Sequence, residues 1–158
     1  FDNSSNSPMG QIPSVRMELY GLSNSGSGVT SDAGQSVYKG SSLRMWKSYF
    51  PEARVIGLDL NPSTVENCEV IVCDQSKEEE LLKVYETIKD ADVIIDDGSH
   101  RMYDQQKTFS IFFKALKPGG LYILEDLHTS VECRMPEKAW CNWGDPTKTT
   151  ALEMLEKL

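Results

Sequence analysis

The sequence predicts an α/β fold built on a doubly wound, mostly parallel sheet. Three observations lead to this prediction. Short apolar runs alternate with segments of helical periodicity, which is the pattern of repeated strand–helix–strand units. Two of the runs, 93–95 and 121–124, are wholly apolar, as strands buried on both faces are. Both runs end in acidic residues, and the carboxyl ends of parallel strands meet at the sheet edge where ligands bind.

The first elements follow from local composition. Residues 1–14 lack periodicity and are predicted to be a flexible lead-in, so the domain is expected to span 15–158. The first strand is predicted at 15–22. A long loop rich in Ser and Gly, 23–40, then opens a helix near Ser41. A loop of this length is uncommon in a compact domain and tends to be functional.

The remaining elements follow from the spacing of apolar residues. Two helices, 77–89 and 103–116, show the i, i+3, i+4, i+7 spacing of one apolar face. The faces consist of Leu81, Val84, Tyr85 and Ile88 in the first helix and of Phe109, Phe112, Phe113 and Leu116 in the second. Strands are predicted at 54–59, 68–73, 92–96 and 121–125, an irregular stretch at 129–148 and a last helix at 149–158.

Composition limits the class of partner. A chain of 158 residues with 39% hydrophobic content is expected to form one domain with a substantial core. The net charge of −8 argues against nucleic acid and against an anionic membrane as the main partner, since both would repel the chain. We therefore expect a small-molecule partner. Composition leaves open whether the chain forms a homo-oligomer.

Cysteine usage favours a reducing compartment. The four cysteines form no CxxC pair, so we interpret them as the reduced thiols of a cytoplasmic protein. Pairing of Cys133 with Cys141 in an oxidising compartment is the alternative. The sequence has no apolar stretch of the roughly 20 residues needed to span a bilayer, and no signal peptide is visible.

Acidic residues at two strand ends indicate a metal site. Asp97, Glu125 and Asp126 would meet at one sheet edge, and carboxylate oxygens are the ligands that Mg²⁺ and other hard cations prefer. Asp96 and Asp97 are adjacent like charges, which is costly unless a cation or hydrogen-bond donors offset them. Gly98 allows a tight turn toward His100, a candidate base. The alternative is that these residues only cap turns.

Two further strand ends indicate a nucleoside. Asp59 ends the second strand, where doubly wound folds bind the ribose hydroxyls of a cofactor. The alternative is that Asp59 stabilises the Asn-Pro turn after it. Asp74 follows the third strand. It could accept a hydrogen bond from an adenine amino group, or it could cap the next helix. Ser76 is the better cap candidate. No GxGxxG is present, which argues against a nicotinamide-dependent oxidoreductase.

The ordered motifs resemble the class I S-adenosylmethionine-dependent methyltransferases, over about residues 15–158. Within that class the chain is most similar to the metal-dependent sugar O-methyltransferases of macrolide biosynthesis and the related cephalosporin-hydroxylase-type group. The motifs are Gly40-Ser41-Ser42-Leu43-Arg44-Met45-Trp46, Tyr49-Phe50-Pro51, Val55-Ile56-Gly57-Leu58-Asp59, Cys73-Asp74-Gln75-Ser76, Ile94-Ile95-Asp96-Asp97-Gly98-Ser99-His100, Leu116-Lys117-Pro118-Gly119-Gly120 and Leu124-Glu125-Asp126-Leu127-His128-Thr129-Ser130.

The resemblance implies a Rossmann-like fold and a reaction. S-adenosylmethionine would be the methyl donor, and a hydroxylated small molecule such as a sugar would be the acceptor. A divalent cation, Mg²⁺ in these enzymes, would lower the pKa of the hydroxyl, and His100 would accept its proton. The cation would be bound by Asp97, Glu125 and Asp126.

The resemblance also implies a cofactor site. Asp59 would bind the ribose, Asp74 and Gln75 the adenine end, and Gly21 and Ser42 would lie near the methionine moiety. Asp96 would lie next to the methyl-transfer centre.

The sequence departs from the resembled pattern at the first strand. Leu19 stands where an acid is usual two residues before the first glycine, and Ser23 stands where a second glycine is usual. The resembled enzymes usually have two further strands after the fifth, whereas this chain stops in a helix. It is expected to be a truncated copy of the fold or to have a five-stranded sheet. These departures support an alternative, a methyltransferase-like binding module without catalysis.

Overall fold

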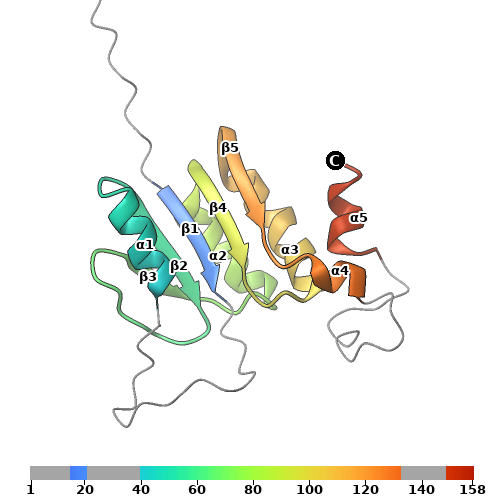
Figure 1. The fold of residues 1–158 in the computed structure, drawn as a ribbon, viewed down its shortest axis with the longest axis horizontal. Coiled ribbons are helices and arrows are strands. Elements are labelled where there is room, and N and C mark those ends of the chain that lie inside the picture. Colours follow the sequence, from blue (N-terminus) through green and yellow to red (C-terminus); the bar gives the residue numbers. More distant parts are fainter. Residues whose placement is uncertain (1–14, 21–39, 133–148) are drawn as a thin grey trace, which may run out of the picture.

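The computed structural model describes residues 15–20, 40–132 and 149–158, and it confirms the predicted α/β fold. Within these residues five parallel strands form one sheet in the order β3-β2-β1-β4-β5 (Figure 1). The strands are β1 (Val15–Tyr20), β2 (Arg54–Asp59), β3 (Glu69–Val72), β4 (Ala91–Asp97) and β5 (Leu116–Leu124). The helices are α1 (Ser41–Tyr49), α2 (Glu78–Ile88), α3 (Met102–Phe112), α4 (His128–Glu132) and α5 (Ala151–Leu155).

The strand order creates a switch point beside β1. The chain runs from β1 outward through β2 to β3, and then returns to the other side of β1 as β4 and β5. In the register, Leu19 lies opposite both Leu58 of β2 and Asp96 of β4, and Tyr20 lies opposite Asp97. Ligands of open α/β sheets bind outside the carboxyl ends of strands at such a point. The end of β4 therefore borders the expected site.

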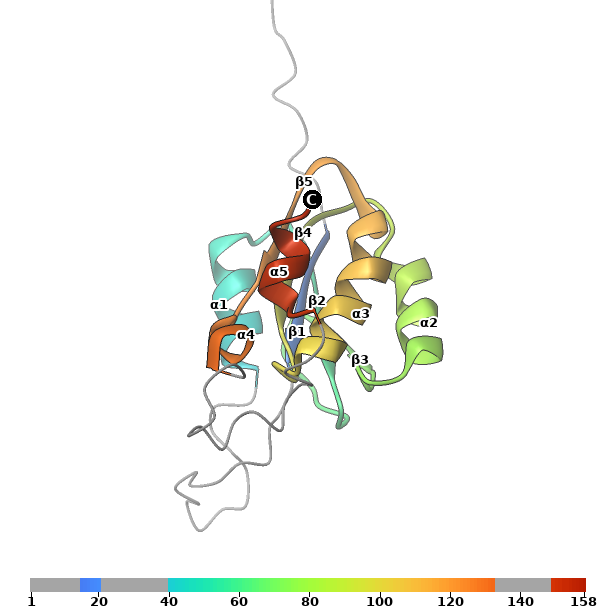
Figure 2. The same ribbon diagram turned by 90° about the vertical axis from the view of Figure 1, so that its right-hand side faces the viewer.

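Helices cover both faces of the sheet, as Figure 2 shows with α1 on one side and α2 and α3 on the other. The core beneath α1 includes Leu43 and Val55. Gly57 permits this close packing, because a Cβ atom there would lie 2.5 Å from Cδ1 of Leu43. The larger core beneath α2 and α3 consists of Ile56, Leu58, Cys73, Leu81, Val84, Ile88, Ala91, Ile94, Phe112 and Ala115.

The predicted apolar face of α2 is confirmed, whereas the prediction for α3 was wrong at its end. Leu81, Val84 and Ile88 are buried against the sheet. The α3 helix stops at Phe112, a 3-10 turn occupies Phe113–Ala115, and Leu116 already belongs to β5. Phe113 is 49% exposed and stacks on Phe109 instead of entering the core. Phe113 and Leu116 continue the helical spacing of apolar residues although they lie beyond the end of α3.

The start of β5 also differs from the prediction at 121. Leu116 lies opposite Ala91, but the next paired residue, Leu121, lies opposite Val93, so the Lys-Pro-Gly-Gly segment between them bulges out of register. Pro118 has no N–H for the ladder, and Gly119 has a φ of +82°. Regular pairing therefore begins at the predicted residue, although the strand begins earlier.

Two elements near the C-terminal end of the chain correct or refine the prediction. The stretch from 129 was predicted to be irregular, but α4 occupies His128–Glu132; one turn and a half is too short for a detectable periodicity. The last helix is shorter than predicted and begins after Thr150, which forms a capping box with Glu153. The expected lead-in and most of the expected loop at 23–40 lie outside the described residues.

No helix of the described residues combines the length and the apolar character that crossing a bilayer would require.

Candidate functional site

The candidate site lies at the carboxyl edge of β4 and β5. Asp97 is the last residue of β4, and His100 and Asp126 lie in the turns that follow the two strands. His100 has a φ of +55° and Asp126 a φ of +54°, the left-handed conformation that side-chain-bearing residues rarely adopt. Asn67 and Asp90, which lie outside the site, have the same backbone conformation. Asn, Asp and His are the side-chain-bearing residues that adopt it most often.

The structure brings these three side chains together. Nε2 of His100 lies 3.3 Å from Oδ2 of Asp126 and 3.7 Å from Oδ1 of Asp97. One ligand atom from each residue lies within 4.8 Å of the other two. The His100 side chain is 16% exposed and that of Asp126 is 50% exposed, so the group opens to solvent on one side. We call Asp97, His100 and Asp126 the carboxylate–histidine group.

Electrostatics in this group favour a bound cation. Partial burial raises the pKa of Asp97, and the Glu125 and Asp126 carboxylates raise it further, while His100 acts in the opposite direction. Burial and the two neighbouring carboxylates thus make the charged form of Asp97 less favourable. A nearby divalent cation would act in the opposite direction.

Glu125 is placed differently from the other two predicted metal ligands. It is exposed and does not belong to the carboxylate–histidine group. Its backbone N–H donates to the carbonyl of Asp96 at 2.9 Å, which holds the end of β5 to the end of β4. His128, at the start of α4, places Nδ1 3.6 Å from Oδ1 of Asp126. Glu125 as a ligand stays a prediction.

Asp96 faces inward instead of toward the group. Its carboxyl is fully buried and accepts hydrogen bonds from Nε2 of Gln75 at 2.9 Å, from the Tyr122 hydroxyl at 3.2 Å and from the Gly98 N–H at 3.3 Å. Burial raises the pKa of Asp96 to about 7, although these hydrogen bonds act to lower it. The buried Asp96 side chain thus stabilises the turn after β4. Its predicted place beside the methyl-transfer centre stays a prediction.

Gln75 has a similar supporting position. Its Oε1 accepts from the N–H of Ser99 at 2.7 Å while its Nε2 binds Asp96. A Cβ atom at Gly98 would lie 2.2 Å from that Oε1, so glycine is needed for the approach of Gln75 to the turn. The predicted contact of Gln75 with adenine stays a prediction.

The two nucleoside-binding candidates take part in local turns. Oδ1 of Asp59 accepts from the Asn61 N–H at 2.8 Å, which is the turn interaction considered as its alternative. Oδ1 of Asp74 accepts from the N–H and the hydroxyl of Ser76 at 2.9 and 2.7 Å. These hydrogen bonds and Lys77 lower the pKa of Asp74. Asp59 retains a second oxygen, whereas Oδ2 of Asp74 lies 3.3 Å from Nζ of Lys77. Ligand binding stays a prediction for both residues.

Three smaller predictions can now be placed. Ser76 was wrong as a cap, because the residue before α2 is Lys77 and no side chain caps the helix. Ser42, the second residue of α1, is half-buried, and Gly21 lies outside the described residues. The β1 register places Leu19 opposite Asp96 and Glu18 opposite Ile95.

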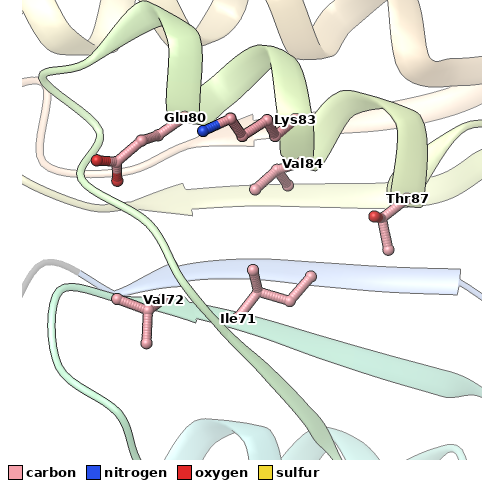
Figure 3. Close-up of a pocket in the computed structure, with 6 residues that line it drawn as sticks. All are labelled: Ile71, Val72, Glu80, Lys83, Val84 and Thr87. Carbon is pink, nitrogen blue, oxygen red and sulfur yellow. The ribbon is translucent and has the colours of Figure 1, made fainter.

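An open hollow between β3 and α2 is separate from the site (Figure 3). Its lining comes from Ile71 and Val72 of β3 and from Glu80, Lys83, Val84 and Thr87 of α2. None of the predicted site residues lines it. The assignment of the site therefore depends on the carboxylate–histidine group.

Sequence reasoning missed several residues that support the site, notably Tyr122, Asp104 and Gln105. Asp104 and Gln105 are both buried. One signal was available: Gln105 precedes Phe109 by four residues and Phe112 by seven, so it is a polar residue on the predicted apolar face of α3. A polar residue at such a position needs a specific partner.

Comparison with known proteins assigns the chain to a group of relatives. No family model matches the chain. L-olivosyl-oleandolide 3-O-methyltransferase of Streptomyces antibioticus is 38% identical over 128 residues, which are 75% of this chain and 31% of the relative. This chain is homologous to the macrolide-sugar O-methyltransferases. The resemblance drawn from the motifs is thereby confirmed.

Two further comparisons match other methyltransferases. A tetracenomycin rhamnosyl 2'-O-methyltransferase of Streptomyces olivaceus is 42% identical over 94 residues, 58% of this chain and 25% of the relative. The structure of the MycE methyltransferase from the mycinamycin biosynthetic pathway, in complex with Mg, SAH (S-adenosylhomocysteine) and mycinamycin VI, aligns with a TM-score of 0.68 and 31% identity. The alignment covers 91% of this chain and 37% of the MycE chain.

The chain matches only part of each relative. The chain spans about a quarter to a third of the length of these curated relatives. A short chain dehydrogenase family protein from Francisella tularensis aligns at 13% identity with a TM-score of 0.52, which shows the Rossmann-like fold alone.

Proposed function

We propose that this chain forms the S-adenosylmethionine- and Mg²⁺-binding part of an O-methyltransferase that acts on a sugar hydroxyl of a glycosylated small molecule. The observation that carries the proposal is the carboxylate–histidine group at the carboxyl edge of β4 and β5 in a homologue of MycE, whose structure contains Mg and SAH. The acid-ended strands of the sequence support the same site.

The residues present fit a divalent cation. Asp97 and Asp126 offer two carboxylate oxygens and His100 one ring nitrogen, all within 4.8 Å of one another. Mg²⁺ is commonly held by one or two carboxylates while it keeps several waters. Asp97 and Asp126 would hold the ion, with Glu125 as a third ligand if its side chain turns inward. When bound, the ion supplies positive charge that lowers the pKa of an acceptor hydroxyl.

His100 is the residue that moves a proton. A sugar hydroxyl is a weak nucleophile near neutral pH and needs a base within hydrogen-bond reach. Nε2 of His100 would accept the proton, and the carboxylates of Asp126 and Asp97, at 3.3 and 3.7 Å, would balance the positive charge formed on the ring. The imidazole is mostly enclosed, so its position is fixed before the acceptor arrives.

The cofactor would lie at the switch point beside β1. Asp59, at the end of β2, would bind the ribose through the oxygen that Asn61 does not use, and Asp74 with Gln75 would lie toward the adenine. Ser42 and Gly21 would border the methionine moiety. When bound, S-adenosylmethionine supplies an electrophilic methyl group. The chain's contribution is to hold that group in line with the acceptor oxygen.

Calorimetry with S-adenosylhomocysteine tests this proposal. We expect the chain to bind it, and we expect Mg²⁺ to bind with or without it. Absence of S-adenosylhomocysteine binding in both the presence and the absence of Mg²⁺ would contradict the enzymatic proposal.

A binding module without catalysis is the second candidate, and the β1 register favours it. Leu19 occupies the place of the usual acid opposite Asp96. An Asp97→Asn or His100→Ala variant separates the two functions. Methyl transfer would be lost in an enzyme, whereas a binding module would keep its partner affinity.

A further inference from the structure

Helix α3 carries two consecutive buried polar residues near its start. Asp104 is 4% exposed and Gln105 is 1% exposed. Burial of a polar side chain costs free energy unless it is hydrogen-bonded, so each should have a specific partner. Oδ2 of Asp104 accepts from the Ser99 hydroxyl at 2.9 Å. Nε2 of Gln105 donates to the Glu125 carbonyl at 3.0 Å.

These two partners lie in the two turns of the candidate site. Ser99 lies between Asp97 and His100 in the turn after β4, and its hydroxyl also accepts from the Arg101 N–H at 3.3 Å. Glu125 directly precedes Asp126 in the turn after β5. One short stretch of α3 thus holds both turns that carry the carboxylate–histidine group.

We propose that Asp104 and Gln105 are positioning residues that fix the separation of the two turns and thereby the spacing of Asp97, His100 and Asp126. The inference rests on the proposed function, because the spacing matters for a bound cation. A ligand group is only as well placed as the residues that hold it, and loss of an outer hydrogen bond commonly weakens metal binding by about 10–100-fold.

Gln105 is well suited to a test because one hydrogen bond defines its role. In the described part of the chain its Oε1 has no hydrogen-bond partner, so Gln105→Met keeps the length and removes only the bond to Glu125. The next residue provides a matched control. Nε2 of Gln106 donates to the carbonyls of Met102 and Thr149, neither of which belongs to the two turns.

The first measurement is the affinity for Mg²⁺ by calorimetry. Gln105→Met is expected to bind Mg²⁺ about tenfold more weakly than the wild type. Its affinity for S-adenosylhomocysteine without Mg²⁺ should be unchanged, which a general loss of structure would not allow. Gln106→Met should match the wild type in both. Asp104→Ala should weaken Mg²⁺ binding, and Asp104→Asn, which keeps an acceptor oxygen, should restore it.

The second measurement is amide hydrogen exchange of residues 121–127 in the metal-free chain. Because Gln105 anchors this turn, Gln105→Met should exchange faster there and Gln106→Met should not. Unchanged exchange in Gln105→Met, or an equal increase in Gln106→Met, would overturn the positioning role. A wild-type chain that binds no Mg²⁺ would instead contradict the proposed function, and the exchange comparison would still decide the role of Gln105.

Discussion

Nε2 of His100 lies 3.3 Å from Oδ2 of Asp126, although the two residues follow different strands of the sheet. The contact arises because β4 and β5 are parallel neighbours, so their carboxyl ends reach the same edge. Both residues have a left-handed backbone conformation. A site of this kind depends on two turns being held in register, and its properties lead to the following predictions.

Mg²⁺ binding should weaken as the pH falls. The weakening should begin at a higher pH than it would at a site built from an ordinary aspartate. The pKa of Asp97 is raised, chiefly by burial and then by Glu125, so protons begin to compete with the cation above the usual range of aspartate. Calorimetric titrations at about pH 5 and about pH 7.5 measure this effect. Equal affinities at the two pH values would argue against Asp97 as a ligand.

Glu125→Gln should lower the pKa of Asp97. The Glu125 carboxylate is the strongest of the neighbouring charges that raise this pKa, and the amide carries no charge. The carboxyl ¹³C shift of Asp97 in a pH titration of the metal-free chain reports the change. As a control, Glu78→Gln at the start of α2 should leave the Asp97 titration unaltered. An Asp97 pKa that does not move in Glu125→Gln would contradict the influence of the Glu125 charge on Asp97.

The free energy of unfolding should decrease as the pH rises from about 4 to about 7, because Asp96 loses its proton over this range. An ordinary aspartate has a pKa of 3.8, whereas the pKa of Asp96 in the folded chain is about 7, so the folded state binds the proton more tightly. A group of this kind stabilises the fold fully below the lower value, and the contribution is lost as the pH rises through the upper one. Asp96→Asn does not titrate.

Urea unfolding of the wild type and Asp96→Asn at several pH values measures this contribution. The difference in the free energy of unfolding should shift in favour of the Asn variant as the pH rises from about 4 to about 7. A difference that is independent of pH would show that Asp96 titrates normally.

Gly98→Ala should destabilise the fold by about 1–3 kcal/mol, the usual cost of overpacking. The new Cβ atom would meet Oε1 of Gln75, which is held by Ser99 on one side and, through its amide nitrogen, by Asp96 on the other. The same substitution in a Gln75→Ser background should cost less, because the obstructing amide is gone. Equal costs in the two backgrounds, measured by urea unfolding, would disagree with the described contact.

The sequence was sufficient for the sheet and for most helices because their signals are local. The buried face of α2 and the two acid-ended strands follow from spacing alone, and the structure has them where they were expected. The end of α3 was misjudged because Phe113 and Leu116 continue the helical spacing, whereas the chain turns at Phe113 and enters β5 at Leu116.

The site was predictable in part for a related reason. Parallel topology dictates that Asp97 and Asp126 meet, but it does not dictate which way Glu125 points or that His100 lies among the carboxylates. Those outcomes depend on Gln75, Asp96 and α3, whose contacts join segments distant in the sequence. Such contacts leave only a weak sequence signal, such as a polar residue on an apolar face.

The most direct test of the account is the binding of Mn²⁺, a spectroscopic substitute for Mg²⁺, followed by electron paramagnetic resonance. We predict one bound ion in the wild type, and an affinity at least about tenfold lower in Asp97→Asn and in Asp126→Asn. Asp90→Asn is the matched control, because Asp90 is an exposed aspartate at the opposite end of β4 whose left-handed backbone asparagine tolerates. Equal affinity in the wild type, Asp97→Asn and Asp126→Asn would contradict the central claim that these carboxylates form a divalent-cation site.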